Sequence, residues 1–261
     1  MSRAWEPSVY LRFAGERARP FTDLLARVCA EHPRTVVDLG CGTGSLTTLL
    51  ADRWPSARVT GIDSSPEMLA AADRHRVPGR IEFAAGDVRT WCPDGDVDVL
   101  VTNAVLHWVP DHGPLLGRWG ALLARGGWLA CQVPGNFAAP THTLLARLCR
   151  SSAWSDRLAG AAPREDAVLP PDGYLDALTA AGLAADVWET TYLHVLRGED
   201  PVLGWVRGTV LRPVLAALDE DAAAAFTAEY AAALRRAYPA RADGTTLLPF
   251  RRVFAVGSRP A

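Results

Sequence analysis

The chain has 261 residues and is almost neutral, because 27 basic residues stand against 29 acidic ones and leave a formal net charge of −2. This balance provides no general attraction to nucleic acid or to an anionic membrane, so we predict a small molecule as the partner. A chain of this length can bury a large core, and we predict one elaborated domain over residues 1–261 that acts as a monomer.

The cysteine pattern and the first residues narrow the class further. The five cysteines are an odd number, are widely spaced and include no CxxC pair, which argues against a disulfide framework and against a zinc site; we predict no metal. Charged residues interrupt every apolar run near the start, unlike in a signal peptide, and no segment reaches the ~20 apolar residues of a membrane span. We therefore expect a cytoplasmic protein.

Apolar runs typical of strands alternate with amphipathic runs typical of helices through the first half of the chain. The predicted strands cover residues 34–40, 57–63, 80–87, 97–103 and 126–134, and the predicted helices cover 45–54, 66–75 and 113–125. This alternation indicates a doubly wound α/β fold with a mostly parallel sheet.

The second half is rich in alanine and leucine and contains two further predicted strands, 184–195 and 246–258, which bring the sheet to seven. The segments 137–170 and 200–240 have helical composition. We predict that they form a cap inserted among the last strands, and that residues 1–30 form a helical segment over the site.

A glycine cluster follows the first predicted strand, at Gly40, Gly42 and Gly44. The spelling GxGxG differs from the GxGxxG of a dinucleotide loop, and a glycine cluster by itself also serves an ordinary strand-to-helix turn. Asp38 lies just before the loop and would repel a pyrophosphate. The pattern therefore favours a ligand that carries an ammonium group beside the loop.

Two further acids follow the next two strands. Asp63 ends the second strand about 20 residues after the loop, where a carboxylate accepts hydrogen bonds from a ribose diol. Asp87 follows the third strand, where it can accept from an exocyclic amine while the main-chain N–H of Val88 meets a ring nitrogen. Ribose, adenine and an ammonium-bearing tail together describe S-adenosyl-L-methionine.

The motifs VVDLGCGTG, GID and GDV occur here in the order found in the class I S-adenosylmethionine-dependent methyltransferases, which this sequence resembles. The resemblance implies a Rossmann-like fold and a set of residues that contact the cofactor. By position these are Asp38, Gly40, Gly42, Gly44, Asp63, Ser64, Met68, Asp87, Val88 and Asn103.

Other residues bear on the acceptor. The segment from Asn103 to Trp108 lacks the Asn/Asp-Pro-Pro-aromatic pattern of nucleobase amino-methyltransferases. Arginines occur instead where the cap is expected to meet the cofactor, and guanidinium groups bind carboxylates bidentately. On the last strand Phe250, Arg252 and Phe254 share one face, so the partner of Arg252 is either a structural acid or a ligand carboxylate.

A closer resemblance covers nearly the whole chain. The segments WEPSVYLRFAGERARPFTDLLARV, LHWVPDH, QVPGNFAAPTH, DVWETTYLH, VLRP and PFRRVFAV are similar to those of the trans-aconitate methyltransferases. The family has Pro and Asn at the loop positions of Thr43 and Ser45, a difference that concerns the cofactor loop. The resemblance implies methyl transfer from S-adenosylmethionine to a carboxylate of a tricarboxylic acid, giving a monomethyl ester.

A carboxylate is ionised at neutral pH and can attack a methyl group without a general base. We therefore predict no acid–base residue and a set of residues that clamp or line the acceptor: Tyr10, Arg17, His107, Trp108, Tyr192, Arg212 and Arg252. Arg17 has an alternative role at the cofactor's own carboxylate, and His107 has alternative roles as a base or as a structural residue.

Three other functions remain open at this stage. The acceptor could be another small polycarboxylate or a specialised metabolite. An NAD-dependent dehydrogenase is opposed by the GxGxG spelling and by the lack of an evident hydride-transfer constellation. A non-catalytic cofactor-binding protein is opposed by the intact loop and its acids.

Overall fold

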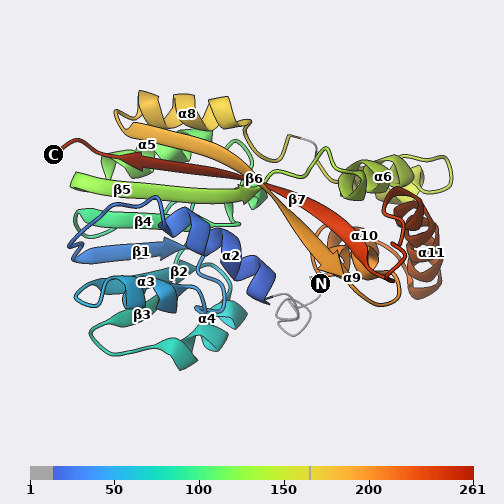
Figure 1. Cartoon of the computed structure of the whole chain (residues 1–261), viewed down its shortest axis with the longest axis horizontal. Coiled ribbons are helices and arrows are strands. Elements are labelled where there is room, and N and C mark those ends of the chain that lie inside the picture. The colour runs from blue at the N-terminus through green and yellow to red at the C-terminus, as the bar shows by residue number, and fades with distance from the viewer. Residues whose placement is uncertain (1–13, 165) are drawn as a thin grey trace. The chain divides into compact units, whose positions relative to one another are not determined.

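The computed structural model describes residues 14–164 and 166–261, and within them seven strands form one sheet in the order β3-β2-β1-β4-β5-β7-β6 (Figure 1). The neighbours from β3 to β5 run parallel, and β7 is antiparallel to β5. The predicted fold class is confirmed. The strands are β1 (Thr35–Leu39), β2 (Arg58–Asp63), β3 (Ile81–Ala85), β4 (Val97–Asn103), β5 (Leu123–Pro134), β6 (Ala184–Leu196) and β7 (Thr246–Ser258).

Helices connect β1 to β2, β2 to β3 and β4 to β5, and helices also occupy both segments predicted as cap. They are α2 (Ala14–Leu25), α3 (Thr47–Arg53), α4 (Pro66–Ala72), α5 (Gly113–Ala121), α6 (Pro140–Cys149), α7 (Ser155–Leu158), α8 (Pro171–Ala180), α9 (Pro201–Arg207), α10 (Arg212–Ala216) and α11 (Glu220–Ala237). Short 3₁₀ turns are η1 (Asp73–His75), η2 (Leu106–Trp108) and η3 (Ala159–Ala161). None of these helices has the length and apolar composition needed to cross a bilayer.

One predicted boundary is wrong. The helix expected over 113–125 ends at Ala121, and β5 begins at Leu123 instead of at residue 126. Leu123 pairs with Val97 of β4, so it belongs to the sheet and not to the helix. An apolar pair such as Leu122-Leu123 fits a helix and a strand equally well, and tertiary pairing decides between them.

The described chain divides into two compact units. The sheet unit comprises Gly15–Pro134, Val168–Thr190 and Arg252–Ala261, and the helical unit includes Gly135–Ala167 and Thr191–Arg251. The unit boundaries fall after Ala14, after β5, after Ala167, within β6 and within β7, so both units contain parts of β6 and β7.

The sheet unit has a core between one face of the sheet and the helices α5 and α8 (Figure 1). Trp119 of α5 and Tyr174 of α8 are completely buried there. The Tyr174 hydroxyl and His112 Nε2 share a hydrogen bond of 2.8 Å, which satisfies both polar groups inside the core. Because Val37 and Leu39 of β1 face this core, Asp38 between them points to the other face.

The helical unit has a separate core made by α6, α9, α10, α11 and neighbouring segments. Trp154 and Phe226 contact edge to face with ring centroids 5.2 Å apart, and the Trp154 indole donates to Glu229 Oε2 at 3.1 Å. The Tyr230 hydroxyl donates to the carbonyl of Thr141 and so links α11 to α6.

Candidate functional site

The glycine loop follows β1 at the carboxyl edge of the parallel strands. The amides of Gly40 and Cys41 donate to the Ile62 carbonyl at 2.7 and 3.0 Å, which holds the loop against the end of β2. Gly40 and Gly44 have φ angles of +78° and +72°, in the left-handed region that favours glycine. A Cβ would lie 2.2 Å from a methyl of Val105 at Gly40 and 2.7 Å from the Phe83 ring at Gly44.

Gly42 differs from its two neighbours. Its φ angle is +55°, but a Cβ added there would meet no atom of the chain within 4 Å. Packing within the protein therefore explains Gly40 and Gly44, whereas the space beside Gly42 is open. A loop with this shape can accept a ligand against its backbone.

Asp63 connects the loop to the end of β2. One carboxylate oxygen accepts from the Gly42 amide and the other from the Ser65 amide, each at 2.9 Å. Ser65 in turn caps α4, because its hydroxyl accepts from the Met68 amide at 3.2 Å. The predicted ribose acid is thus held in a fixed orientation at the loop.

Asp38 lies beneath the loop and is only 2% exposed. Burial raises the pKa of Asp38 from 3.8 to about 6, although a hydrogen bond of 2.7 Å from the Thr47 hydroxyl opposes this rise. A carboxylate with so little solvation favours a cationic partner. This environment suits the ammonium group that is predicted to lie beside the loop.

Asp87 follows β3 and pairs with Arg89, which was not among the predicted site residues. The amide and the guanidinium of Arg89 donate to its carboxylate, with Nε 2.9 Å from Oδ1, and this contact lowers the pKa of Asp87 to about 2. The Arg89 contacts reach both carboxylate oxygens. A carboxylate has about four lone-pair positions, so an exocyclic amine has to replace one of these contacts, and the adenine role of Asp87 stays a prediction.

The remaining predicted cofactor residues lie on the same unit. Ser64 is exposed and Met68 is half-buried in the first turn of α4, while Val88 is half-buried after β3. Asn103 ends β4, and its buried Oδ1 has no partner among the residues the structure describes. The next residue, Ala104, has a φ angle of +56°, a strained conformation that marks this strand end as a candidate site.

The predicted acceptor residue Arg252 lies on β7 and is 5% exposed, so its charge is buried. Its Nη1 donates to Oε1 of Gln132 on β5 at 3.2 Å. Arg251 is exposed, and its Nε donates to the carbonyl of Gly135. Gln132 was not among the predicted site residues, although it is a single polar residue in the apolar run LACQVP.

An aromatic stack that includes Phe254, two residues after Arg252, joins β7 to β6. Phe254 stacks on Trp188 of β6 with centroids 4.9 Å apart and planes 6° apart, and the Arg27 guanidinium lies 5.0 Å from the centroid of the Trp188 ring. Arg27 also pairs with Asp186 at 2.8 Å. These contacts form a cluster of two stacked aromatic rings and one guanidinium beside β7.

His107 and Trp108 belong to the turn η2, which follows β4 after Ala104 and Val105. Their ring centroids are 4.7 Å apart, His107 is half-buried, and Trp108 is 58% exposed. An indole with this exposure has most of its surface available for a further contact. The role of both residues in lining the acceptor pocket remains a prediction.

Other predicted acceptor residues are in the helical unit or outside the described part. Tyr192 is 3% exposed and stacks with His194 at 6.5 Å between centroids, and Arg212 begins α10. Tyr10 lies outside the described residues, and so does the Arg17 side chain, although its backbone belongs to α2. Their substrate roles remain predictions.

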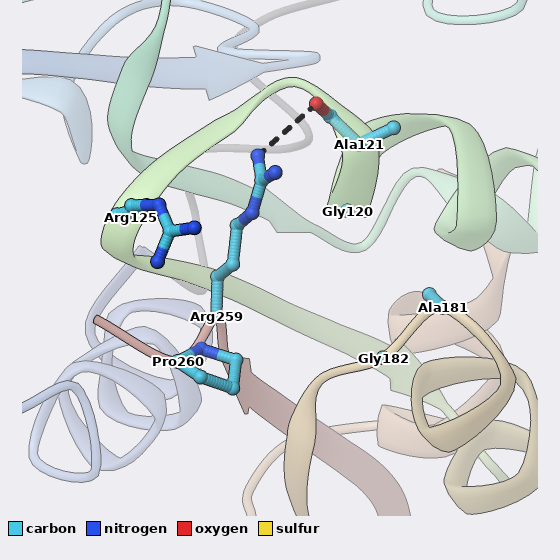
Figure 2. Close-up of a pocket in the computed structure, with 7 residues that line it drawn as sticks. All are labelled: Gly120, Ala121, Arg125, Ala181, Gly182, Arg259 and Pro260. Carbon is cyan, nitrogen blue, oxygen red and sulfur yellow. Dashed lines mark hydrogen bonds between the residues drawn. The ribbon is translucent and has the colours of Figure 1, made fainter.

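A cavity of about 420 Å³ lies elsewhere, near the start of β5 and the end of β7 (Figure 2). Arg259 crosses it and donates to the carbonyl of Ala121 at 3.5 Å, at the end of α5. The glycine loop is at the carboxyl ends of the parallel strands, so this cavity belongs to the opposite edge of the sheet. Over residues 14–164 and 166–261, no three His, Cys, Asp or Glu side chains gather as a metal site.

Residues 36–127 match the family model described as a methyltransferase domain. Phosphoethanolamine N-methyltransferase 2 of Haemonchus contortus shares the fold, with a TM-score of 0.57 and 16% identity over 93% of this chain and 53% of that chain. The sheet order and this structural similarity therefore show the class I methyltransferase fold.

Similar curated proteins show the family to which the chain belongs. The trans-aconitate 2-methyltransferase of Streptomyces coelicolor is 58% identical over 98% of this chain and 87% of its own length. That of Streptomyces avermitilis is 57% identical over 99% of this chain and 98% of its own length. This chain belongs to the trans-aconitate 2-methyltransferase family.

Proposed function

We propose that this protein transfers the methyl group of S-adenosyl-L-methionine to a carboxylate of trans-aconitate and releases the monomethyl ester with S-adenosyl-L-homocysteine. The names of relatives that match the chain over almost its full length support this proposal. The structural observation that carries it is the burial of the Arg252 guanidinium. Arg252 projects from the same face of the sheet as Asn103, close to the carboxyl end of β4.

The residues around the glycine loop fit this cofactor. The space beside Gly42 accepts the ligand, Asp63 presents oxygens to a ribose, and the buried Asp38 favours an ammonium group. When bound, the cofactor supplies an electrophilic methyl group on a sulfonium. The protein has to hold the acceptor in line with that group and to exclude water from one carboxylate oxygen.

The acceptor is already ionised at neutral pH, so the protein need not remove a proton. Its task is to offset the repulsion among the carboxylates of one substrate. Arg252 fits this task because a guanidinium stays charged when it is buried. Arg17 and Arg212 are proposed as further clamps, while His107, Trp108, Tyr192 and Tyr10 are proposed to line the pocket.

The test is to incubate the protein with labelled S-adenosylmethionine and, separately, trans-aconitate, cis-aconitate, citrate, isocitrate and a malonyl thioester, and to identify products by mass. We expect a monomethyl ester of trans-aconitate at the highest rate. Faster transfer to another polycarboxylate or to a specialised metabolite would replace the substrate and keep the class. Binding of NAD in place of S-adenosylhomocysteine would overturn both the proposed substrate and the methyltransferase class.

Replacing Gly42 by alanine is expected to weaken the binding of S-adenosylhomocysteine at least tenfold, because the new methyl group enters the open space beside the loop. Gly79→Ala is the matched control: its φ angle is +76°, it also has no atom within 4 Å of an added Cβ, and it lies away from the loop. Both variants carry a similar backbone cost of about 1–2 kcal/mol. Equal affinities in calorimetry would show that the cofactor does not occupy this space.

Replacing His107 by alanine is expected to lower kcat by less than about tenfold, because a pocket-lining residue contributes less than a general base. With saturating cofactor, wild-type kcat should stay flat between pH 6 and 8.5. A catalytic imidazole would instead make the rate fall as the pH decreases through about 6.5. Loss of activity in the variant together with such a profile would contradict the mechanism without a base.

A further inference from the structure

Gln132 is buried next to the predicted acceptor clamp and has an incomplete set of hydrogen bonds. Its side chain is 1% exposed on β5, where Oε1 accepts from Arg252 Nη1 at 3.2 Å. Its Nε2 has no hydrogen-bond partner among residues 14–164 and 166–261. An amide nitrogen buried without a partner is destabilising, so its retention in an interior calls for an explanation.

The orientation of this amide follows from its partner. A guanidinium has only N–H donors, so the atom of Gln132 that faces Arg252 has to be the carbonyl oxygen. Rotation of the amide by 180° would place two donors against each other. Arg252 thus fixes which way the Gln132 amide is turned, with Oε1 facing the guanidinium and Nε2 on the other side of the amide group.

The sheet register places these groups at the edge where ligands bind. Gln132 pairs with Asn103 of β4 on one side and with Phe254 of β7 on the other, and Arg252 pairs with Pro134. Residues paired across strands project to the same face, and residues two apart on one strand do so as well. Asn103, Gln132 and Arg252 therefore project from one face near the carboxyl ends of β4 and β5, the usual position of ligands in open α/β sheets.

The composition of the chain supports a specific role for this amide. The sequence contains one glutamine and two asparagines, Asn103 and Asn136. Each of the three has a buried side-chain oxygen or nitrogen with no partner within the described part of the chain. Carboxamides that are used so rarely, and are placed in the interior with bonding capacity left over, are suited to a ligand.

We propose that Gln132 is a substrate-binding residue whose Nε2 donates to a carboxylate of the acceptor, in an orientation fixed by Arg252. This inference rests on the proposed function and adds to it a specificity residue for polycarboxylates. An anionic acceptor suits both donors, because the guanidinium and the amide N–H groups offer no acceptor atom. A neutral ester or hydroxyl compound gains less from the pair.

Gln132→Glu separates this role from a purely structural one. Glutamate keeps an oxygen acceptor for Arg252 and so preserves a structural partnership, but it replaces the N–H donors by a charge that repels a carboxylate. Gln132→Met removes the donors without adding charge and serves as a second test if the glutamate variant folds poorly. Cys131→Ala is the matched control, since it alters β5 at the adjacent position, whose side chain belongs to the core on the other face.

The experiment measures trans-aconitate binding by calorimetry in the complex with S-adenosylhomocysteine, together with KM, with S-adenosylhomocysteine affinity and with the melting temperature. For both Gln132 variants we expect trans-aconitate affinity to fall roughly 10- to 100-fold while the affinity for S-adenosylhomocysteine stays unchanged, as expected for the loss of a hydrogen bond to a charged group. Cys131→Ala should keep both affinities.

Two results would overturn the inference alone: unchanged trans-aconitate binding in folded Gln132→Glu, or an equal loss of S-adenosylhomocysteine affinity, which would assign the amide to the carboxylate of the cofactor. If the wild-type complex binds no tricarboxylate at all, the proposed function fails, and the inference fails with it.

Discussion

Replacing Asp38 by asparagine is expected to stabilise the ligand-free protein and to weaken its binding of S-adenosylhomocysteine at the same time. Burial raises the pKa of Asp38 to about 6, above its ordinary value of 3.8. The folded state therefore binds a proton more tightly than the unfolded state, and the free energy of unfolding falls as the pH rises from about 4 to above 6. A difference of about two pKa units between the folded and unfolded states corresponds to a change of roughly 3 kcal/mol in the free energy of unfolding over this pH range.

Asparagine has no charge to desolvate, and its carbonyl can still accept from the Thr47 hydroxyl. We therefore expect Asp38→Asn to raise the free energy of unfolding at pH 8 by about 1–3 kcal/mol and to have little effect near pH 4.5, where wild-type Asp38 is protonated. Urea denaturation at both pH values measures this difference, and the low-pH pair is the internal control.

The same substitution should lower the affinity for S-adenosylhomocysteine roughly 10- to 100-fold at pH 8, because it removes a charge-assisted contact to the ammonium group. For the wild type, affinity should decrease as the pH falls through about 6, since protonation of Asp38 competes with the ligand. An asparagine variant that binds with wild-type affinity, measured by calorimetry, would remove Asp38 from the cofactor site.

Replacing Arg252 by methionine is expected to lower kcat/KM for trans-aconitate by about 30- to 1000-fold, equivalent to about 2–4 kcal/mol for the loss of one partner of a buried charge pair. Methionine keeps much of the side-chain length, so the loss comes mainly from the guanidinium. Initial rates over a range of trans-aconitate concentrations measure it, and the affinity for S-adenosylhomocysteine should stay close to that of the wild type.

Arg251→Met provides the control on the same strand. Arg251 is exposed and its Nε donates to the carbonyl of Gly135, so its loss removes an arginine and a hydrogen bond without touching the Gln132 contact. We expect activity near that of the wild type. Comparable losses of kcat/KM in the two variants, or a loss in Arg252→Met explained entirely by unfolding, would contradict a carboxylate clamp at Arg252.

Much of the predicted cofactor site could be derived from the sequence because one pattern, an apolar strand followed by an acid, occurs three times along the chain. Asp38, Asp63 and Asp87 each follow a short apolar run, and parallel strands bring their carboxyl ends to one edge of the sheet. The Gly42 amide donates to the Asp63 carboxylate, so the loop and the end of the second strand lie together. The alternation of strands and helices likewise predicted the fold class.

Other features depend on contacts that no local pattern encodes. The Arg252–Gln132 hydrogen bond joins residues 120 positions apart and forms only because β7 lies beside β5 in antiparallel orientation. The pairing of Asp87 with Arg89 is local, but an arginine two residues on has many rotamers, and the sequence does not select one. The start of β5 depended on the pairing of Leu123 with Val97.

The sequence by itself determined the fold class, and it predicted a cofactor loop with three acids and the chemical type of acceptor suggested by the arginines. These follow from the period of apolar residues, from backbone conformations open mainly to glycine, and from the charges of side chains. Only the tertiary structure decided which polar groups are buried together, because desolvation and hydrogen bonding depend on strand order. It thereby distinguished Gly42 from the packed glycines and raised the pKa of Asp38, and it placed Gln132 against Arg252.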